Sequence, residues 1–325
     1  MQHLVTLQDW SAEQIRSVLD LADHIKRDPA AFHHAMHRKV LLMIFEKPSL
    51  RTRLSFEAGM SRMGGHAIFY DTRTSPMAAG KETIEDSIRV SSRFADVIMA
   101  RLFEHNHLEQ MAAFASVPVI NALTDFAHPC QTLADLQTIR EKKGDLAGLT
   151  LAYLGDSNNN VTHSLLFGCT TMGMHVRIGC PPGKENEPKA SVVAAAREEA
   201  EAHGTSVVIT TDASEAVAGA DVVYTDSWMS YHIEASQLDE RVALFTPYQV
   251  NQSRMAEASR DAVFMNCLPA VRGFEQTAEV IDGPQSIVFD QAENRMHAQN
   301  AVILELLGRA QRDGECLETS VDDKP

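Results

Sequence analysis

The sequence predicts an α/β protein with two doubly wound parallel sheets and an active-site cleft between two domains. Short apolar runs of strand length alternate with amphipathic helical stretches along nearly the whole chain. This alternation restarts after the charged, glycine-containing residues 142–144. Polar side chains follow the ends of several predicted strands, and in open α/β sheets that edge is where ligands bind.

Composition narrows the class of protein. The chain has 325 residues, 44% of them apolar and 22% charged, which is typical of a soluble globular protein with room for two domains. Its net charge of −15 argues against nucleic acid or an anionic membrane as the main partner. The five cysteines are widely spaced and form no CxxC pair, so no zinc site or disulfide framework is expected. With no signal-peptide pattern at the start, we expect a cytoplasmic protein.

The first part of the chain predicts a helix, a strand and a second helix. Ser11 and Gln14 have the spacing of a capping box before an amphipathic stretch. Residues 40–45 are an unbroken apolar run that is typical of a buried strand. Beyond it, Leu50, Leu54 and Ala58 recur every fourth residue. Phe56, Met60 and Met63 widen this apolar stripe, which predicts a helix that ends at residues 64–65.

The remaining elements follow in the same alternating order. Residues 74–81 are small and polar and predict a mobile loop over a site, and residues 83–94 predict a helix. Further strands are predicted at residues 67–70, 96–100, 117–121, 149–154, 175–178, 206–209, 221–224, 262–265 and 286–290. A final helix is predicted to begin near residue 293.

The turn after the first strand predicts an anion site. It contains Ser49, Arg51, Thr52 and Arg53 where a helix begins, and the first backbone N–H groups of a helix are unpaired and partly positive. Hydroxyl and guanidinium donors at such a turn suit the oxygens of a phosphate. The alternative is a capped helix whose arginines are merely solvated.

Five other polar residues share a place at the carboxyl ends of predicted strands: Arg101, His128, Asn160, Asp226 and Cys267. Arg101 and His128 come from the first half of the chain, and together with Gln131 they supply donors that can polarise a carbonyl oxygen. In the second half Asp226 can hold an ammonium group, Asn160 a carboxylate, and Cys267 can position an amine or assist its deprotonation. Each also has an ordinary structural alternative, as a turn residue, a helix cap or a small buried side chain.

Four ordered motifs, Ser49–Arg53, His128–Gln131, Asp226–Trp228 and Cys267–Ala270, resemble the aspartate/ornithine carbamoyltransferase family. The resemblance covers nearly the whole chain, including residues 289–297, and is greatest to the ornithine branch of the family. It implies transfer of the carbamoyl group of carbamoyl phosphate to the side-chain amine of L-ornithine, giving L-citrulline and phosphate in arginine biosynthesis. It also implies a reaction with no metal, cofactor or covalent enzyme intermediate.

The resemblance further implies a role for each matching residue. Carbamoyl phosphate is expected to bind Ser49, Leu50, Arg51, Thr52, Arg101, His128, Gln131, Cys267, Leu268 and Arg295, and the acceptor Asn160, Asp226, Ser230 and Tyr231. Among these, Arg101, His128, Cys267 and Asp226 are expected to be catalytic, whereas Arg53 is expected to support the loop. The implied domains are residues 1–142 for carbamoyl phosphate and 143–292 for the amino acid, with a C-terminal helix, 293–325, returning to the first domain of a homotrimer.

Some positions depart from the ornithine pattern, so alternatives stay open. Leu50 replaces a threonine, Met77 a glutamine, and Asn266 and Val271 histidines, while Ser230-Tyr231-His232 replaces Ser-Met-Gly. The acceptor could therefore be another amine, such as putrescine or a different diamino acid, or the chain could be a non-catalytic sensor of carbamoyl phosphate. A nucleotide-dependent dehydrogenase is disfavoured, because the turn at Gly155 lacks a G-x-G-x-x-G pattern.

Overall fold

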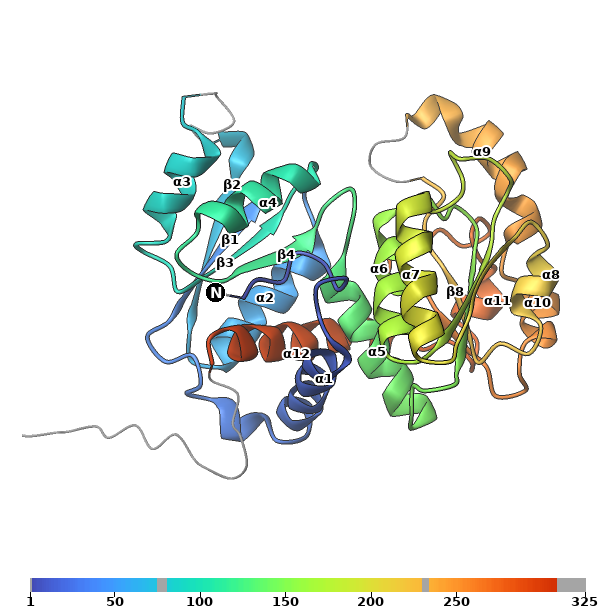
Figure 1. The fold of residues 1–325 in the computed structure, drawn as a ribbon, viewed down its shortest axis with the longest axis horizontal. Coiled ribbons are helices and arrows are strands. Elements are labelled where there is room, and N and C mark those ends of the chain that lie inside the picture. The colour runs from blue at the N-terminus through green and yellow to red at the C-terminus, as the bar shows by residue number, and fades with distance from the viewer. Residues whose placement is uncertain (1, 75–80, 230–233, 309–325) are drawn as a thin grey trace, which may run out of the picture.

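The computed structural model describes residues 2–74, 81–229 and 234–308 (Figure 1). Within these residues the chain forms two separate parallel sheets packed against helices, which confirms the predicted fold class. Residues 75–80 of the predicted loop, with Met77, and residues 230–233 of the predicted acceptor loop lie outside the described part of the chain.

The first sheet has the strand order β2-β1-β3-β4. Its strands are β1 (Val40–Phe45), β2 (His66–Asp71), β3 (Val97–Arg101) and β4 (Val119–Leu123). The helices of this half are α1 (Ala12–Arg27), α2 (Leu50–Arg62), α3 (Ile84–Ser91), α4 (His105–Phe114) and α5 (Pro129–Lys143), with 3₁₀ turns at Pro29–Phe32 and Thr72–Thr74. The predicted strands and the capping box of Ser11 and Gln14 are confirmed, whereas α4 was not predicted.

The second sheet has the order β7-β6-β5-β8-β9. Its strands are β5 (Thr150–Leu154), β6 (His175–Gly179), β7 (Val207–Thr210), β8 (Val222–Thr225) and β9 (Val263–Met265). The helices are α6 (Asn160–Thr171), α7 (Ala190–Ala202), α8 (Ala213–Val217), α9 (Leu238–Phe245), α10 (Gln252–Glu257) and α11 (Ala278–Ile281), with 3₁₀ turns at Ala235–Gln237 and Thr246–Tyr248. Each of these strands lies within one residue of its predicted range.

The strand orders fix where a ligand can bind. The chain winds in opposite directions from β1 and β3 in the first sheet, and from β5 and β8 in the second. Such switch points leave a crevice at the carboxyl ends of the strands. Ser49 follows β1 and Arg101 ends β3, while Asn160 and Asp226 come after β5 and β8. Both switch points therefore carry predicted site residues.

The strand predicted at residues 286–290 is wrong. Only Ser286 makes an isolated bridge, to Phe264, and helix α12 (Val288–Leu306) has already begun two residues later. An apolar run this short does not separate a strand from the first turn of a helix, in which Val288 is buried and Phe289 is 70% exposed. The final helix thus begins before residue 293, and residues 309–325 lie outside the described part.

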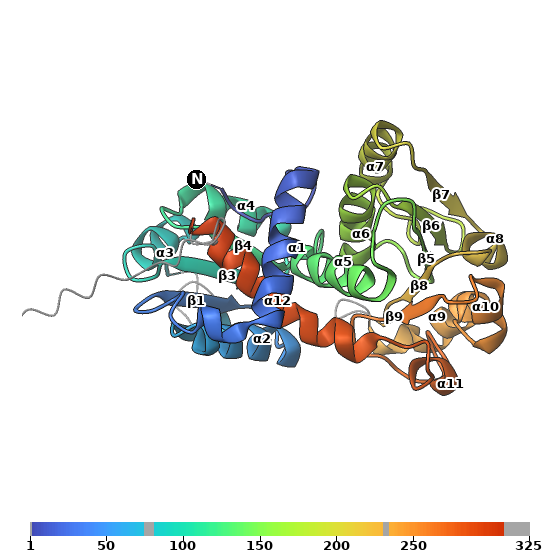
Figure 2. The same ribbon diagram turned by 90° about the horizontal axis from the view of Figure 1, so that it is seen from below.

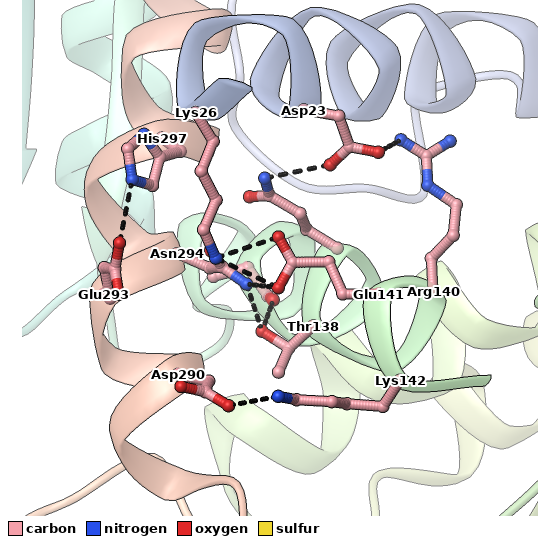
Figure 3. A network of polar contacts seen from close by, with 12 residues as sticks. Asp23, Lys26, Thr138, Arg140, Glu141, Lys142, Asp290, Glu293, Asn294 and His297 are labelled. Carbon is pink, nitrogen blue, oxygen red and sulfur yellow. Dashed lines mark hydrogen bonds and ion pairs between the residues drawn. The ribbon is translucent and has the colours of Figure 1, made fainter. Parts of the chain in front are cut away.

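The long helix α12 returns from the second sheet to the first half of the chain and packs on α1, α2 and α5 (Figure 2). Polar contacts fix α12 against α1 and α5 (Figure 3). Lys26 Nζ donates to Glu141 Oε1 at 2.9 Å and to Asn294 Oδ1 at 2.7 Å, and Asn294 Nδ2 donates to Thr138 Oγ1 at 2.9 Å.

The domain boundary after residue 142 stays a prediction.

The apolar stripe predicted for α2 is buried only in part. Leu50 and Leu54 are 69% and 54% exposed, whereas the buried face carries Phe56 and Met60 together with smaller residues, including Thr52 and Gly59. A Cβ built on Gly59 would lie 2.1 Å from Asn300 Oδ1, so α2 and α12 approach too closely for a side chain there. Small residues permit this approach, which a search for large apolar residues does not detect.

Candidate active site

A cavity of about 790 Å³ lies between the two sheets at the carboxyl ends of their strands. It brings together every predicted site residue that the structure describes. Its lining includes Ser49, Leu50, Arg51, Thr52, Arg101, His128, Gln131, Asn160, Asp226, Cys267, Leu268 and Arg295. Ser230 and Tyr231, also predicted, lie outside the described residues. The roles of all these residues stay predictions.

One end of the cavity is built to hold an anion. Ser49 caps α2 by accepting from the backbone N–H of Thr52 at 3.3 Å, and its own hydroxyl donates to Thr52 Oγ1 at 3.0 Å. Arg101 Nη1 and Arg295 Nη2 donate to the same Thr52 oxygen at 3.4 and 3.3 Å. A hydroxyl oxygen has only two lone pairs, so three donors bind it weakly and can turn to a stronger acceptor such as a phosphate.

Neutral donors lie beside this cationic end. His128 begins α5, and its backbone N–H donates to Ser164 Oγ of α6 at 2.7 Å. Burial, together with the nearby charges of Arg295 and Arg101, holds the pKa of His128 well below its ordinary value. Its ring is therefore neutral near pH 7 and can donate one hydrogen bond to a carbonyl oxygen. Gln131 lies one turn further along α5 and accepts from Arg295 Nη1 at 2.7 Å.

On the side of the second sheet the cavity carries a half-buried carboxyl and a half-buried thiol. Cys267 Sγ donates to Asp226 Oδ1 at 3.1 Å, and the backbone N–H of Ser227 donates to the same oxygen at 2.7 Å. Burial raises the pKa of Asp226, and burial and Asp226 together raise the pKa of the Cys267 thiol well above its ordinary value. The thiol therefore stays protonated, which favours positioning of an amine over its deprotonation.

Asn160 links the two halves of the chain at this cavity. It is the first residue of α6, and its Nδ2 donates to the carbonyl of Thr124 after β4 at 2.5 Å. Arg53, by contrast, is not in the lining: it pairs with Glu57 at 3.0 Å and lies 4.0 Å above the ring of Phe69. Its position agrees with the supporting role expected for it.

Sequence reasoning missed several residues that line the cavity, chiefly Lys47, His163 and Lys189. Lys47 lies in the turn between β1 and α2, 8% exposed, and burial and Arg101 lower its pKa to about 8. Its place two residues after a predicted strand end was a usable signal. His163 accepts from the backbone N–H of Lys189 at 3.3 Å. No local sequence pattern predicts this contact between distant segments.

Asn266, which replaces a histidine of the ornithine pattern, shapes the turn that follows β9. Its Oδ1 accepts from the backbone N–H of Leu268 at 2.7 Å, and its backbone N–H donates to Gln291 Oε1 at 3.1 Å. Leu268 has a φ of 56°, a conformation that L-residues adopt only when their surroundings hold it. Val271, another departure, is 49% exposed and is absent from the cavity lining.

The described residues contain neither a metal-binding cluster nor a membrane-spanning helix. No group of three or more His, Cys, Asp or Glu side chains within residues 2–74, 81–229 and 234–308 could hold a metal ion. None of the helices in these ranges is long and apolar enough to span a membrane.

Comparisons with known proteins agree with the geometry. Residues 2–141 match the carbamoyl-P binding domain of aspartate/ornithine carbamoyltransferases, and residues 147–306 match the Asp/Orn binding domain. The ornithine carbamoyltransferase of Anoxybacillus flavithermus is 48% identical over 305 residues, covering 93% of this chain and 96% of that protein.

Solved structures give the same result. The ornithine carbamoyltransferase of Pyrococcus furiosus superposes with a TM-score of 0.90 at 45% identity, covering 94% of this chain and 97% of that one. An N-acetyl-L-ornithine transcarbamylase superposes with a TM-score of 0.84 at 30% identity, covering 94% and 100%. The chain belongs to the aspartate/ornithine carbamoyltransferase family.

Proposed function

We propose that the protein transfers the carbamoyl group of carbamoyl phosphate to the side-chain amine of L-ornithine, giving L-citrulline and phosphate. One observation carries this proposal: an anion cradle at Thr52 and a hydrogen-bonded pair, Asp226 and Cys267, lie in the same cavity. The first suits a phosphate, and the second suits the ammonium group of an amino acid. The names of the similar proteins give further support.

In this proposal the donor lies at the cationic end of the cavity. Its phosphate binds at the N-terminus of α2, to Ser49, Arg51 and Thr52. There it attracts the guanidinium groups that donate to the Thr52 hydroxyl in this structure. The carbamoyl oxygen lies among Arg101, His128 and the Gln131 amide. These donors stabilise the negative charge that develops on that oxygen when the amine attacks.

The acceptor lies toward the second sheet. Asp226 holds the ammonium group on the α-carbon of the acceptor, and Asn160 holds the carboxylate of the acceptor. Cys267 keeps its thiol proton and helps to orient the side chain of the acceptor. The unprotonated side-chain amine attacks the carbamoyl carbon, and the bond from that carbon to the phosphate oxygen breaks. The attacking nitrogen gives up one proton to the departing phosphate. Catalysis therefore comes from positioning and electrostatics, with no bond from substrate to enzyme.

We further propose a homotrimer, or a multiple of trimers, built from the first half of the chain. Leu54 on α2 and Ile68 on β2 are 54% and 43% exposed, and β2 is an edge strand of its sheet. Exposed apolar residues along an unpaired strand edge favour association with another chain. The cytoplasmic location and the place in arginine biosynthesis rest on the sequence features and the family resemblance.

Steady-state kinetics with a panel of amines test the acceptor. With carbamoyl phosphate as donor, we expect L-ornithine to give the highest kcat/KM among ornithine, putrescine, other diamino acids and N-acetyl-L-ornithine. The last lacks the α-ammonium group that Asp226 is proposed to hold. Faster turnover of any other amine would overturn the choice of ornithine, and carbamoyl phosphate binding without turnover of any amine would indicate a sensor.

Arg101→Ala tests the role of the donors around the carbamoyl oxygen. We expect kcat to fall about 10²–10³-fold, the usual cost of removing one donor to a developing oxyanion. Arg62→Ala, at the exposed end of α2, is the matched control and should leave kcat unchanged. Circular dichroism checks that both variants are folded. Turnover near the wild-type rate in folded Arg101→Ala would contradict the assigned role.

The pKa of about 8 for Lys47 predicts how anion affinity depends on pH. Below that pH the ammonium is charged and attracts phosphate, and above it the charge is lost. We expect the association constant of inorganic phosphate, measured by calorimetry, to fall by up to roughly tenfold between pH 7.5 and 9.5. Lys47→Met should flatten this decrease, whereas Lys39→Met, which removes the partner of Asp96 at 2.7 Å, should not. The same decrease in both variants would exclude Lys47 as its source.

Light scattering tests the assembly. The wild-type protein should have three times the 35.8 kDa mass of the chain, or a multiple of that mass. Leu54→Glu places a charge in the proposed interface and should lower the mass, whereas Val90→Glu, at another exposed apolar position on α3, should not. A monomeric wild-type protein would refute the trimer.

A further inference from the structure

A buried carboxyl group behind the cavity joins three elements of the fold. Asp135 of α5 accepts through Oδ1 from Gln131 Nε2 at 2.9 Å and from Gln291 Nε2 of α12 at 2.7 Å. Its Oδ2 accepts from the Tyr224 hydroxyl of β8 at 3.2 Å, and that hydroxyl also accepts from Gln291 Nε2 at 3.0 Å. Asp135, Tyr224 and Gln291 are fully buried and are absent from the cavity lining.

On the donor side, this carboxyl group sets the orientation of the Gln131 amide. Asp135 Oδ1 accepts from the side-chain nitrogens of both glutamines, and a carboxyl oxygen without a proton can only accept, so the amide nitrogen of Gln131 must face Asp135. Its oxygen is then directed to Arg295 Nη1, at 2.7 Å, and the same guanidinium reaches Thr52. One N–H of Gln131 is used by Asp135, and the second remains for a ligand in the cavity.

On the acceptor side, the same group reaches the turn that carries Cys267. Gln291 binds Asp135 and Tyr224 through its nitrogen, so its oxygen is left to accept from the backbone N–H of Asn266 at 3.1 Å. Asn266 Oδ1 in turn accepts from Leu268 at 2.7 Å. The turn that holds Cys267 beside Asp226 is therefore tied to α5 through Gln291.

The path of hydrogen bonds is thus continuous from Thr52, at the anion cradle, to Leu268, at the acceptor end. Its intermediate members Gln131, Asp135 and Gln291 are 1%, 0% and 0% exposed. Breaking one link leaves a partner buried and unsatisfied, so the remaining groups are expected to move. Burial raises the pKa of Asp135 to about 7, although the hydrogen bonds from its three donors lower it. Burying this carboxyl group therefore costs free energy.

We propose that Asp135 and Gln291 are positioning residues for the carbamoyl transfer, which fix the Gln131 amide on one side of the cavity and the Cys267 turn on the other. The inference rests on the proposed function, because positioning matters only where two substrates must meet. Errors of about 1 Å in such placement can lower the rate 10²-fold. Asp135 and Gln291 touch no substrate and act through Gln131 and Asn266.

Three variants on α5 separate positioning from ordinary stability. Asp135→Leu removes the acceptor, and we expect kcat/KM for both substrates to fall about 10–100-fold. Asp135→Asn keeps an oxygen for both glutamines and can donate to the Tyr224 hydroxyl, so it should stay within about threefold of the wild type. Thr138→Val is the matched control, since it breaks the bond from Asn294 on the same two helices without touching the path (Figure 3). It should lower the melting temperature and leave kcat/KM unchanged.

Gln291→Met breaks the link to Asn266 and leaves the bond between Asp135 and Gln131 in place. We expect the KM for ornithine to rise about tenfold, while the affinity for inorganic phosphate changes less than about threefold. This split is not expected from a general loss of stability. If Asp135→Leu does not fold, Gln291→Met alone still tests whether this path of hydrogen bonds positions the Cys267 turn. Folded Asp135→Leu and Gln291→Met with wild-type kcat/KM for both substrates would overturn the proposal, as would an equal loss in Thr138→Val.

The inference can fail separately from the proposed function. If the wild-type protein turned over no ornithine, the proposed function would fail, and phosphate affinity would test the donor side alone. Asp135→Leu should then bind inorganic phosphate about tenfold more weakly than Thr138→Val, because Gln131 and Arg295 lose their fixed orientation. Equal affinities in these two variants would overturn the inference.

Discussion

Two guanidinium groups, of Arg101 and Arg295, meet at the hydroxyl of Thr52 in the first turn of α2. Both arginines are nearly fully buried, and burial lowers the pKa of Arg295. Charges in such a place are costly unless an opposite charge joins them. In the proposed reaction, the anionic donor would supply this opposite charge. The neutral state of His128 follows from the same constraint, since a further cation would add to the repulsion.

The fold meets this constraint by bringing distant segments together. Arg101 ends β3, Thr52 begins α2, and Arg295 comes from α12, near the end of the described chain. Helix α12 reaches the site only because it returns from the second sheet and packs on α1, α2 and α5 (Figure 2). The close approach at Gly59, where a Cβ would lie 2.1 Å from Asn300, belongs to the same packing. The position of Arg295 beside Thr52 thus depends on the packing of α12.

Sequence reasoning worked where function depends on local pattern. Strand ends and the helix start at Ser49 can be predicted from neighbouring residues. Both sheets were therefore predicted, and every described site residue lies at the cavity. It did not work where contacts between distant segments decide. Residues 286–290 are a short apolar run whose last three residues begin helix α12, and Leu54 of the apolar stripe on α2 is exposed. Neither a buried acceptor such as Asp135 nor its donor Gln291 has a sequence signal, because their partners lie on different elements.

The charges around the cavity favour one arrangement of the substrates in the proposed reaction. Arg51, Arg101 and Arg295 line the cavity from α2, β3 and α12, while the Asp226 carboxyl lines it from the turn after β8. Burial raises the pKa of Asp226, but an ammonium group beside it has the opposite effect and favours the ionised carboxylate. A positively charged acceptor thus strengthens its own site, whereas an anion placed there meets an uncompensated carboxylate. In the proposed reaction, donor and acceptor would therefore bind with their charges opposed, which would bring the carbamoyl carbon between the anion cradle and the amine.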